Sequence, residues 1–113
     1  MKPNNAAYIA HIRDAIEQIL LYAAHHTHDQ YLQNSWDQAA VARNLEIIGE
    51  AATQLTAEYK NAHPAIPWRK LSDFRNVLTH EYFAVDSDLV WEILQKDIPI
   101  LQEEVKQLLE EFR

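Results

Sequence analysis

The residues best suited to chemistry lie together between positions 74 and 82, where the sequence reads FRNVLTHEY. Arg75 carries a planar guanidinium whose fixed set of donors fits a phosphate group. His80 carries an imidazole, a group that titrates near neutral pH and can move a proton. These two groups suffice for RNA cleavage without a metal. The imidazole can take the proton of a ribose 2′-hydroxyl while the guanidinium stabilises charge on the attacked phosphate.

The spacing of these polar residues limits how they can act together. On an ideal helix Arg75 and Tyr82 share one face, and Asn76 and His80 share an adjacent face. Arg75 and His80 lie about 140° apart around the axis. Long side chains, a frayed helix end or a partner subunit is therefore needed to bring both to one substrate. The alternative without chemistry is a helix with a capping histidine and a surface arginine.

Hydrophobic periodicity predicts that the elements positioning this motif are all helical. The helices need a shared core, so we expect an all-α bundle of four to five helices that forms one domain, residues 1–113. The helices are expected over residues 5–25, 36–60, 73–83 and 86–112, with short turns near residues 31–32 and 68–71. Pro64 and Pro67 forbid continuation of the second helix.

Capping residues mark where several of these helices should begin. Thr27 with Gln30 has the spacing of a capping box and predicts the short turn that follows the first helix. Ser35 with Gln38 has the same spacing and is expected to open the long second helix. Ser72 is the expected N-cap of the helix that carries the motif.

Three further features predict how the long helices pack. Gly49 lies inside the second helix, where glycine costs about 1 kcal/mol relative to alanine, so we expect another backbone to pack closely against it. Pro99 predicts a kink in the last helix. That helix carries an apolar seam that could face its own bundle or a second subunit. The seam consists of Leu94, Ile98, Leu101, Val105, Leu108 and Phe112.

Charged residues on the second helix have two interpretations. Arg43, Glu46 and Glu50 follow one another at spacings of three and four residues, which suits a ladder of ion pairs along the helix. Alternatively, Glu46 or Glu50 lines the catalytic cleft and orients the motif residues from the neighbouring helix.

The other histidines give no comparable signal. His25, His26 and His28 lack the spacing of a helical metal-binding pair, and a solvated helix end is the favoured interpretation. His11 lies on the polar side of the first helix, and we assign it no role.

Composition restricts the partners of this chain. There are 17 acidic residues against 10 lysines and arginines, a net charge of −7, which argues against a uniformly basic RNA-binding surface. Residues 60–80 nevertheless hold four cations against one acid, so a local positive cleft is expected at the motif. No cysteine, no Gly-rich phosphate loop and no long apolar run occurs. These absences favour a cytoplasmic chain that has no membrane span and needs no cofactor.

The motif resembles that of a known family. Arg75, His80 and Tyr82 match the R-x4-6-H-x-Y signature of HepT-like toxins in the HEPN superfamily of ribonucleases. Residues 43–51, RNLEIIGEA, are similar to the second-helix stretch of that family. The resemblance covers nearly the whole chain, through further positions at Pro67-Trp68, Val85-Asp86, Trp91 and Pro99.

This resemblance implies a HEPN-like homodimer with two copies of the motif in a cleft at the interface. It implies that Arg75 and His80 are the ribonuclease residues and that Asn76 helps to orient the site. Tyr82 would be the residue that a partner antitoxin, a minimal nucleotidyltransferase, modifies with AMP from ATP. Many relatives carry Gly-Met just before the arginine where this chain has Asp73-Phe74, which adds a carboxylate that could pair with Arg75.

The leading hypothesis is therefore an endoribonuclease toxin of a type II toxin–antitoxin pair, with RNA as substrate. A second hypothesis is a non-catalytic nucleotide- or partner-binding module that docks a nucleotidyltransferase subunit. A third is a structural four-helix dimer whose seam on the last helix is the whole function.

Overall fold

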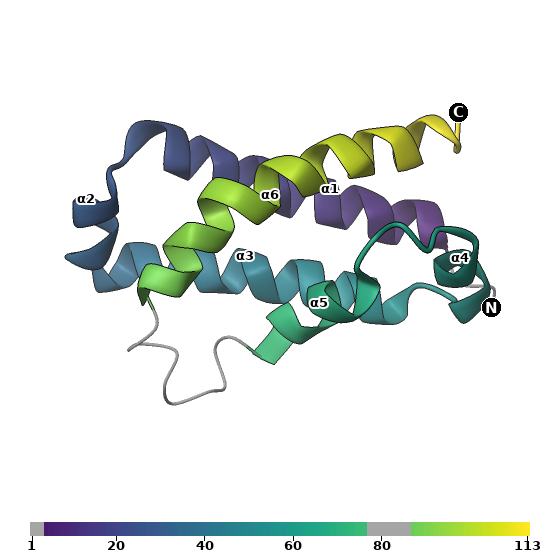
Figure 1. Cartoon of the computed structure of the whole chain (residues 1–113), viewed down its shortest axis with the longest axis horizontal. Helices are drawn as coiled ribbons and strands as arrows, with labels where there is room; N and C mark the ends of the chain where they lie inside the picture. The colour runs from purple at the N-terminus through teal and green to yellow at the C-terminus, as the bar shows by residue number, and fades with distance from the viewer. Residues whose placement is uncertain (1–3, 77–86) are drawn as a thin grey trace.

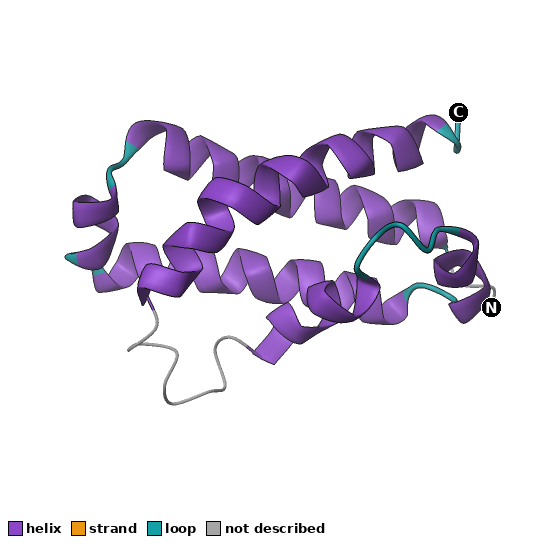
Figure 2. Ribbon diagram, viewed as in Figure 1, coloured by secondary structure: helices purple, strands orange, loops and turns teal. Residues whose placement is uncertain are grey.

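A computed structural model describes residues 4–76 and 87–113 of the chain, and these residues form helices joined by short loops, with no strand among them (Figures 1 and 2). The prediction of an all-α fold is confirmed. The helices are α1 Asn5–His25, α2 His28–Leu32, α3 Ser35–Gln54, α4 Ala57–Ala62, α5 Trp68–Asp73, the 3-10 helix η1 Phe74–Asn76 and α6 Ser87–Glu110. None of the helices formed by the described residues could span a lipid bilayer.

The body of the molecule consists of the three long helices. α1 packs against both α3 and α6, α2 closes one end, and α5 with η1 packs against the outer side of α3 (Figure 1). The side chains in the centre of this body are almost wholly inaccessible to solvent. They include Ile9, Ile12, Ile16, Ile19, Tyr31, Leu45, Ile48, Leu94 and Ile98.

The apolar seam of α6 faces this core. Its residues from Leu94 to Leu108 are buried within the single chain, so the hypothesis that the seam itself joins two subunits is wrong. Phe112 is the exception, because it lies beyond the end of the helix and is 43% exposed. Its ring stacks on Tyr59 at a centroid distance of 5.9 Å. Pro99 lies within α6, which continues through it.

The first predicted capping box is present. The amide of Gln30 donates to the hydroxyl of Thr27 over 3.1 Å, and the amide of Thr27 donates to the Gln30 side chain over 2.8 Å. These two bonds satisfy amide groups that a helix N-terminus leaves without partners.

The second predicted capping box is wrong. Asn34, not Ser35, caps α3, and its side-chain oxygen accepts from the amide of Asp37 over 3.1 Å. The side-chain amide of Gln38 instead donates from Nε2 to the carbonyls of Tyr31 and Leu32, at 3.0 and 3.1 Å. Gln38 thus ties α2 to α3, which makes it unavailable for the capping box.

The second long helix also ends earlier than predicted. α3 stops at Gln54, and Leu55 takes an extended conformation that buries its side chain in the core. Thr56 then caps α4 by accepting from the amide of Tyr59 over 3.1 Å. The side chain of Asn5 accepts from the amide of Thr56 over 3.2 Å. Burial of one leucine and a threonine cap therefore break the helix before the prolines do.

The start of the motif helix differs from the prediction as well. Ser72 lies inside α5, so it is not an N-cap. α5 begins after Pro67 because Trp68 is anchored there, its indole nitrogen donating to the carbonyls of Lys60 and His63 at 3.1 and 3.0 Å. The chain then passes directly into η1. The rest of the helix predicted over 73–83 lies outside the described residues.

Candidate functional site

Arg75 is held against α3 by a contact between two backbones. A Cβ atom built on Gly49 would lie 2.3 Å from the amide nitrogen of Arg75 and 2.9 Å from its Cα, closer than real Cβ atoms approach other atoms. Only glycine leaves the space that η1 occupies, which confirms the prediction that another backbone packs against Gly49. The neighbouring Phe74 is buried and fixes η1 from the core side.

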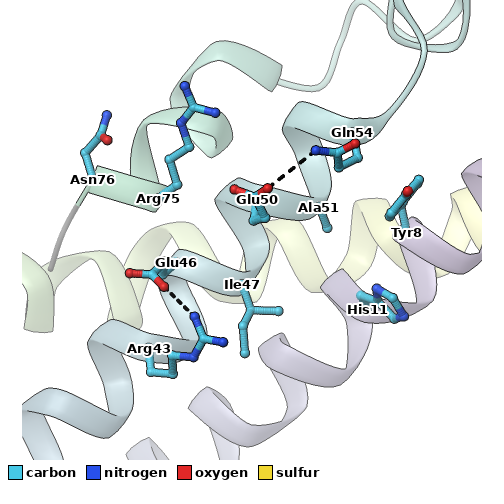
Figure 3. A pocket seen from close by; sticks show the side chains of 10 residues that line it. All are labelled: Tyr8, His11, Arg43, Glu46, Ile47, Glu50, Ala51, Gln54, Arg75 and Asn76. Carbon is cyan, nitrogen blue, oxygen red and sulfur yellow. Dashed lines mark hydrogen bonds and ion pairs between the residues drawn. The ribbon is translucent and has the colours of Figure 1, made fainter. Parts of the chain in front are cut away.

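A groove of about 650 Å³ opens at this contact (Figure 3). α3 forms its floor, η1 forms one wall and α1 forms the other. Its lining comprises Arg75 and Asn76 from η1, Tyr8 and His11 from α1, and Arg43, Glu46, Ile47, Glu50, Ala51 and Gln54 from α3.

The guanidinium of Arg75 is exposed on the η1 wall. One of its terminal nitrogens lies 3.5 Å from the hydroxyl of Thr53, which in turn donates to the carbonyl of Gly49 over 2.9 Å. In the described part of the chain no carboxylate forms an ion pair with Arg75, so the pair with Asp73 that the sequence left open does not form. Its charge can therefore meet an anion that enters the groove.

Both interpretations of the acidic residues on α3 hold in part. Arg43 forms an ion pair with Glu46, as the ladder predicts, whereas Glu50 accepts a hydrogen bond from Gln54 over 3.4 Å (Figure 3). Glu46 and Glu50 also line the groove, as the cleft interpretation predicts. Within the described residues neither carboxylate is ion-paired with Arg75.

Fewer cations of residues 60–80 reach the groove than the net charge of that segment predicts. The Lys70 ammonium pairs with Asp97 of α6 over 3.2 Å, and the Lys60 ammonium donates to the carbonyl of Ala52 over 3.3 Å. Of the cations in that segment, only Arg75 lines the groove. The described part of the basic segment therefore supplies one cationic side chain to the groove rather than an extended positive surface.

The structure thus brings four of the predicted site residues to one groove: Arg75, Asn76, Glu46 and Glu50. His80 and Tyr82 lie outside the described residues, so their predicted roles stay predictions. Sequence reasoning missed Tyr8 and His11. Their spacing of three residues on α1 was a signal that they share a helix edge, but not that this edge faces α3.

The histidines between residues 25 and 28 have separate structural contacts. The His26 ring stacks on Tyr22 at a centroid distance of 4.0 Å. His28 stacks on Trp91 and lies 2.8 Å from a carboxylate oxygen of Asp88. Among residues 4–76 and 87–113, no three potential metal ligands converge.

Comparison with known proteins decides the family. Residues 12–108 match the family model described as ribonuclease HepT-like. The chain belongs to this family. The match runs from Ile12 in α1 to Leu108 in α6, so it includes the groove residues of α3 and η1 but not Tyr8 and His11.

Several named proteins are similar to this HepT-like chain. One is the "Probable ribonuclease HepT" of Thermococcus cleftensis, 37% identical over 96% of this chain and 98% of its own length. Another is a "Putative RNase" of Caldanaerobacter subterraneus, 33% identical over 91% and 92% of the two chains.

A longer relative is the "Gamma-glutamylcyclotransferase and putative RNase" of Methanocaldococcus jannaschii, 39% identical over 99% of this chain. The chain spans about half the length of that protein. No solved structure matches the chain.

Proposed function

We propose that this chain is a metal-independent endoribonuclease that acts as the toxin of a toxin–antitoxin pair in the cytoplasm. The observation that carries the proposal is the placement of Arg75. Its guanidinium is exposed at a groove, is held there by the contact of its backbone with Gly49, and belongs to a chain of the HepT-like ribonuclease family.

The chemistry follows from the two motif side chains. The His80 imidazole removes the proton from a ribose 2′-hydroxyl, and the resulting oxygen attacks the adjacent phosphorus. The bond to the 5′-oxygen breaks, which leaves a 2′,3′-cyclic phosphate and, after that oxygen takes a proton from a protonated imidazole or water, a 5′-hydroxyl. Arg75 binds the non-bridging oxygens as their charge rises. No metal or organic cofactor takes part in these steps.

The other site residues support this reaction. Asn76 follows Arg75 on the same groove wall and orients the phosphate. Glu46 and Glu50 lie across the floor and limit how deep a phosphate can enter, because like charges repel. A homodimer would place two copies of the motif in one cleft, which would supply a second imidazole to the leaving oxygen.

Control of the toxin would act on Tyr82. A partner nucleotidyltransferase would transfer AMP from ATP to the tyrosine hydroxyl, with release of pyrophosphate. Added AMP is bulky and anionic, so it would occupy the phosphate site at Arg75 and cancel its positive potential. Mass spectrometry of protein co-expressed with such a partner should show one or more AMP increments on Tyr82. Unmodified Tyr82 in protein that the partner has neutralised would contradict this mode of control.

Cleavage assays on purified protein test the ribonuclease directly. With a chelator present, wild-type protein should cut single-stranded RNA, Arg75→Ala should be slower by about 100- to 1,000-fold, and His80→Ala by about 100- to 10,000-fold. Arg69→Ala is the matched control, because Arg69 is exposed on α5 but does not line the groove. Wild-type rates in Arg75→Ala and His80→Ala would disprove the catalytic assignment.

A non-catalytic module that docks a nucleotidyltransferase remains the second candidate, since an exposed guanidinium and an amide on one wall suit phosphate binding without cleavage. Growth distinguishes the two functions. Expression without a partner should stop growth only if the chain cleaves RNA, and Arg75→Ala should relieve the arrest.

A further inference from the structure

The two walls of the groove carry different chemistry, a guanidinium on η1 and two aromatic rings on α1 (Figure 3). We propose that the α1 wall is a nucleobase subsite. A base of single-stranded RNA stacks on Tyr8 and His11 while the phosphate next to it reaches Arg75. This inference rests on the proposed ribonuclease function and extends it to the recognition of the substrate.

Tyr8 and His11 form a preorganised pair. Their rings meet edge to face, at a centroid distance of 6.1 Å and an interplanar angle of 83°. Tyr8 is half-buried and packs against the core, whereas His11 is exposed. An edge-to-face pair leaves ring surface open to a third ring, and single-stranded RNA is recognised largely by stacking of its unpaired bases on such side chains.

The floor between the two walls suits a base rather than a phosphate. Half-buried Ile47 presents apolar surface on the floor of the groove, and the buried Ala51 lies beneath it. Glu46 and Glu50 lie beside them and can accept hydrogen bonds from the amino groups of a base, but they repel a phosphate. A nucleotide therefore has one favourable orientation, with its base toward α1 and its phosphate toward Arg75.

Single-stranded RNA fits this groove better than a second copy of the chain does. Subunit interfaces have apolar cores, and the large apolar side chains that are most exposed in the described part of the chain do not line the groove. Trp36, at 85% exposure, and Ile100, at 64%, are the strongest examples. The groove instead combines charges of both signs with a pair of aromatic rings.

Binding of a short 2′-O-methyl oligoribonucleotide, which lacks the attacking hydroxyl, tests the subsite without cleavage. Fluorescence anisotropy should show affinity about 5- to 150-fold weaker for Tyr8→Leu and for His11→Ala than for wild type, the range expected for loss of one base–aromatic stack. Tyr8→Phe keeps the aromatic ring and should bind the oligonucleotide about as tightly as wild type does. His25→Ala is the matched control, since His25 is exposed on the same helix about 21 Å from His11 along the helix axis.

A thermodynamic cycle separates stacking from other effects. An oligonucleotide with abasic residues should bind wild type more weakly than the intact strand does. Tyr8→Leu should bind the two strands nearly equally, because the ring that senses the base is gone. If Tyr8→Leu and His11→Ala bind the intact strand as wild type does, the subsite does not exist.

Three further results distinguish the possible failures. If these variants change the mass of the protein in sedimentation but not its RNA affinity, the groove is a contact between copies and the subsite is disproved. If Arg75→Ala abolishes cleavage while Tyr8→Leu and His11→Ala bind and cleave as wild type, the subsite fails and the ribonuclease stands. If wild type binds RNA through Tyr8 yet never cleaves it, the proposed function fails and the subsite stands.

Discussion

Gly49→Ala isolates the contact that places Arg75 on the groove. The added Cβ would lie 2.3 Å from the amide nitrogen of Arg75 and 2.9 Å from its Cα. Carbon atoms pack best at about 3.5–4.0 Å, so η1 has to move by about 1 Å. The overlapping atoms include backbone, and a change of rotamer cannot relieve the clash.

Stability and cleavage should respond differently to this substitution. Alanine favours the interior of a helix by about 1 kcal/mol relative to glycine, whereas overpacking costs about 1–3 kcal/mol. The net loss of stability is therefore about 0–2 kcal/mol, a fall in Tm of up to about 8 °C. Displacement of a positioning group by about 1 Å costs about 100-fold in rate, so cleavage should fall far more than stability does.

Denaturant unfolding and the rate of RNA cleavage, measured on the same preparation, check this expectation. Ala42→Val is the matched control, because Ala42 lies on α3, is fully buried and does not line the groove. It should lose about 1–3 kcal/mol of stability without the 100-fold loss of rate. If Gly49→Ala gains about 1 kcal/mol and cleaves RNA as wild type does, the backbone contact is absent and the reasoning is refuted.

Three further predictions test the fold. His63 lies between two acceptors, the Tyr59 carbonyl and the Glu111 carboxylate, each 2.9 Å from a ring nitrogen, and these bonds raise its pKa above the usual 6.5. The raised pKa belongs to the folded state, so protonated His63 stabilises the fold. The Tm of wild type should therefore exceed that of His63→Gln below about pH 6, and the difference should decline as pH rises through the raised pKa. A Tm difference that does not change with pH would contradict this. Asn34→Ala should cost about 1 kcal/mol and Ser35→Ala less, by urea unfolding, if Asn34 is the cap. Trp68→Phe removes an indole donor to two carbonyls and should cost about 1–3 kcal/mol in the same assay.

Much of the fold could be predicted because the deciding signals are local or periodic. The stripe on α1, the Thr27 box and the seam of α6 each lie within one segment of sequence. The predicted helix ends are wrong where two neighbouring residues could both cap or end a helix and tertiary contacts determine which one does. Ser35 has the spacing of a capping box, yet Asn34 caps α3 because Gln38 is bound to the end of α2.

The candidate site was predicted on one wall and missed on the other. Arg75 and Asn76 follow from motif chemistry, and the buried glycine at residue 49 indicated a close backbone contact without naming what makes it. Tyr8 and His11 become part of the groove only because α1 packs beside α3 with these two residues opposite residues 43–54 of α3. That registration depends on side-chain packing between distant segments, which periodicity within α1 does not reveal.

The pairing of charges around the groove predicts how salt should affect RNA binding. Lys70 is paired with Asp97 and Arg43 with Glu46, which leaves Arg75 as the groove cation without an ion-pair partner among the described residues. Single-stranded nucleic acid loses affinity with a log–log slope of about −0.7 for each phosphate neutralised. An uncleavable oligonucleotide should therefore show a slope of about −0.7 for one Arg75, or about −1.4 if two copies of the chain share the strand. A slope steeper than about −3 would require an extended basic surface, and would refute a groove in which one guanidinium holds the phosphate and stacking supplies the rest of the affinity.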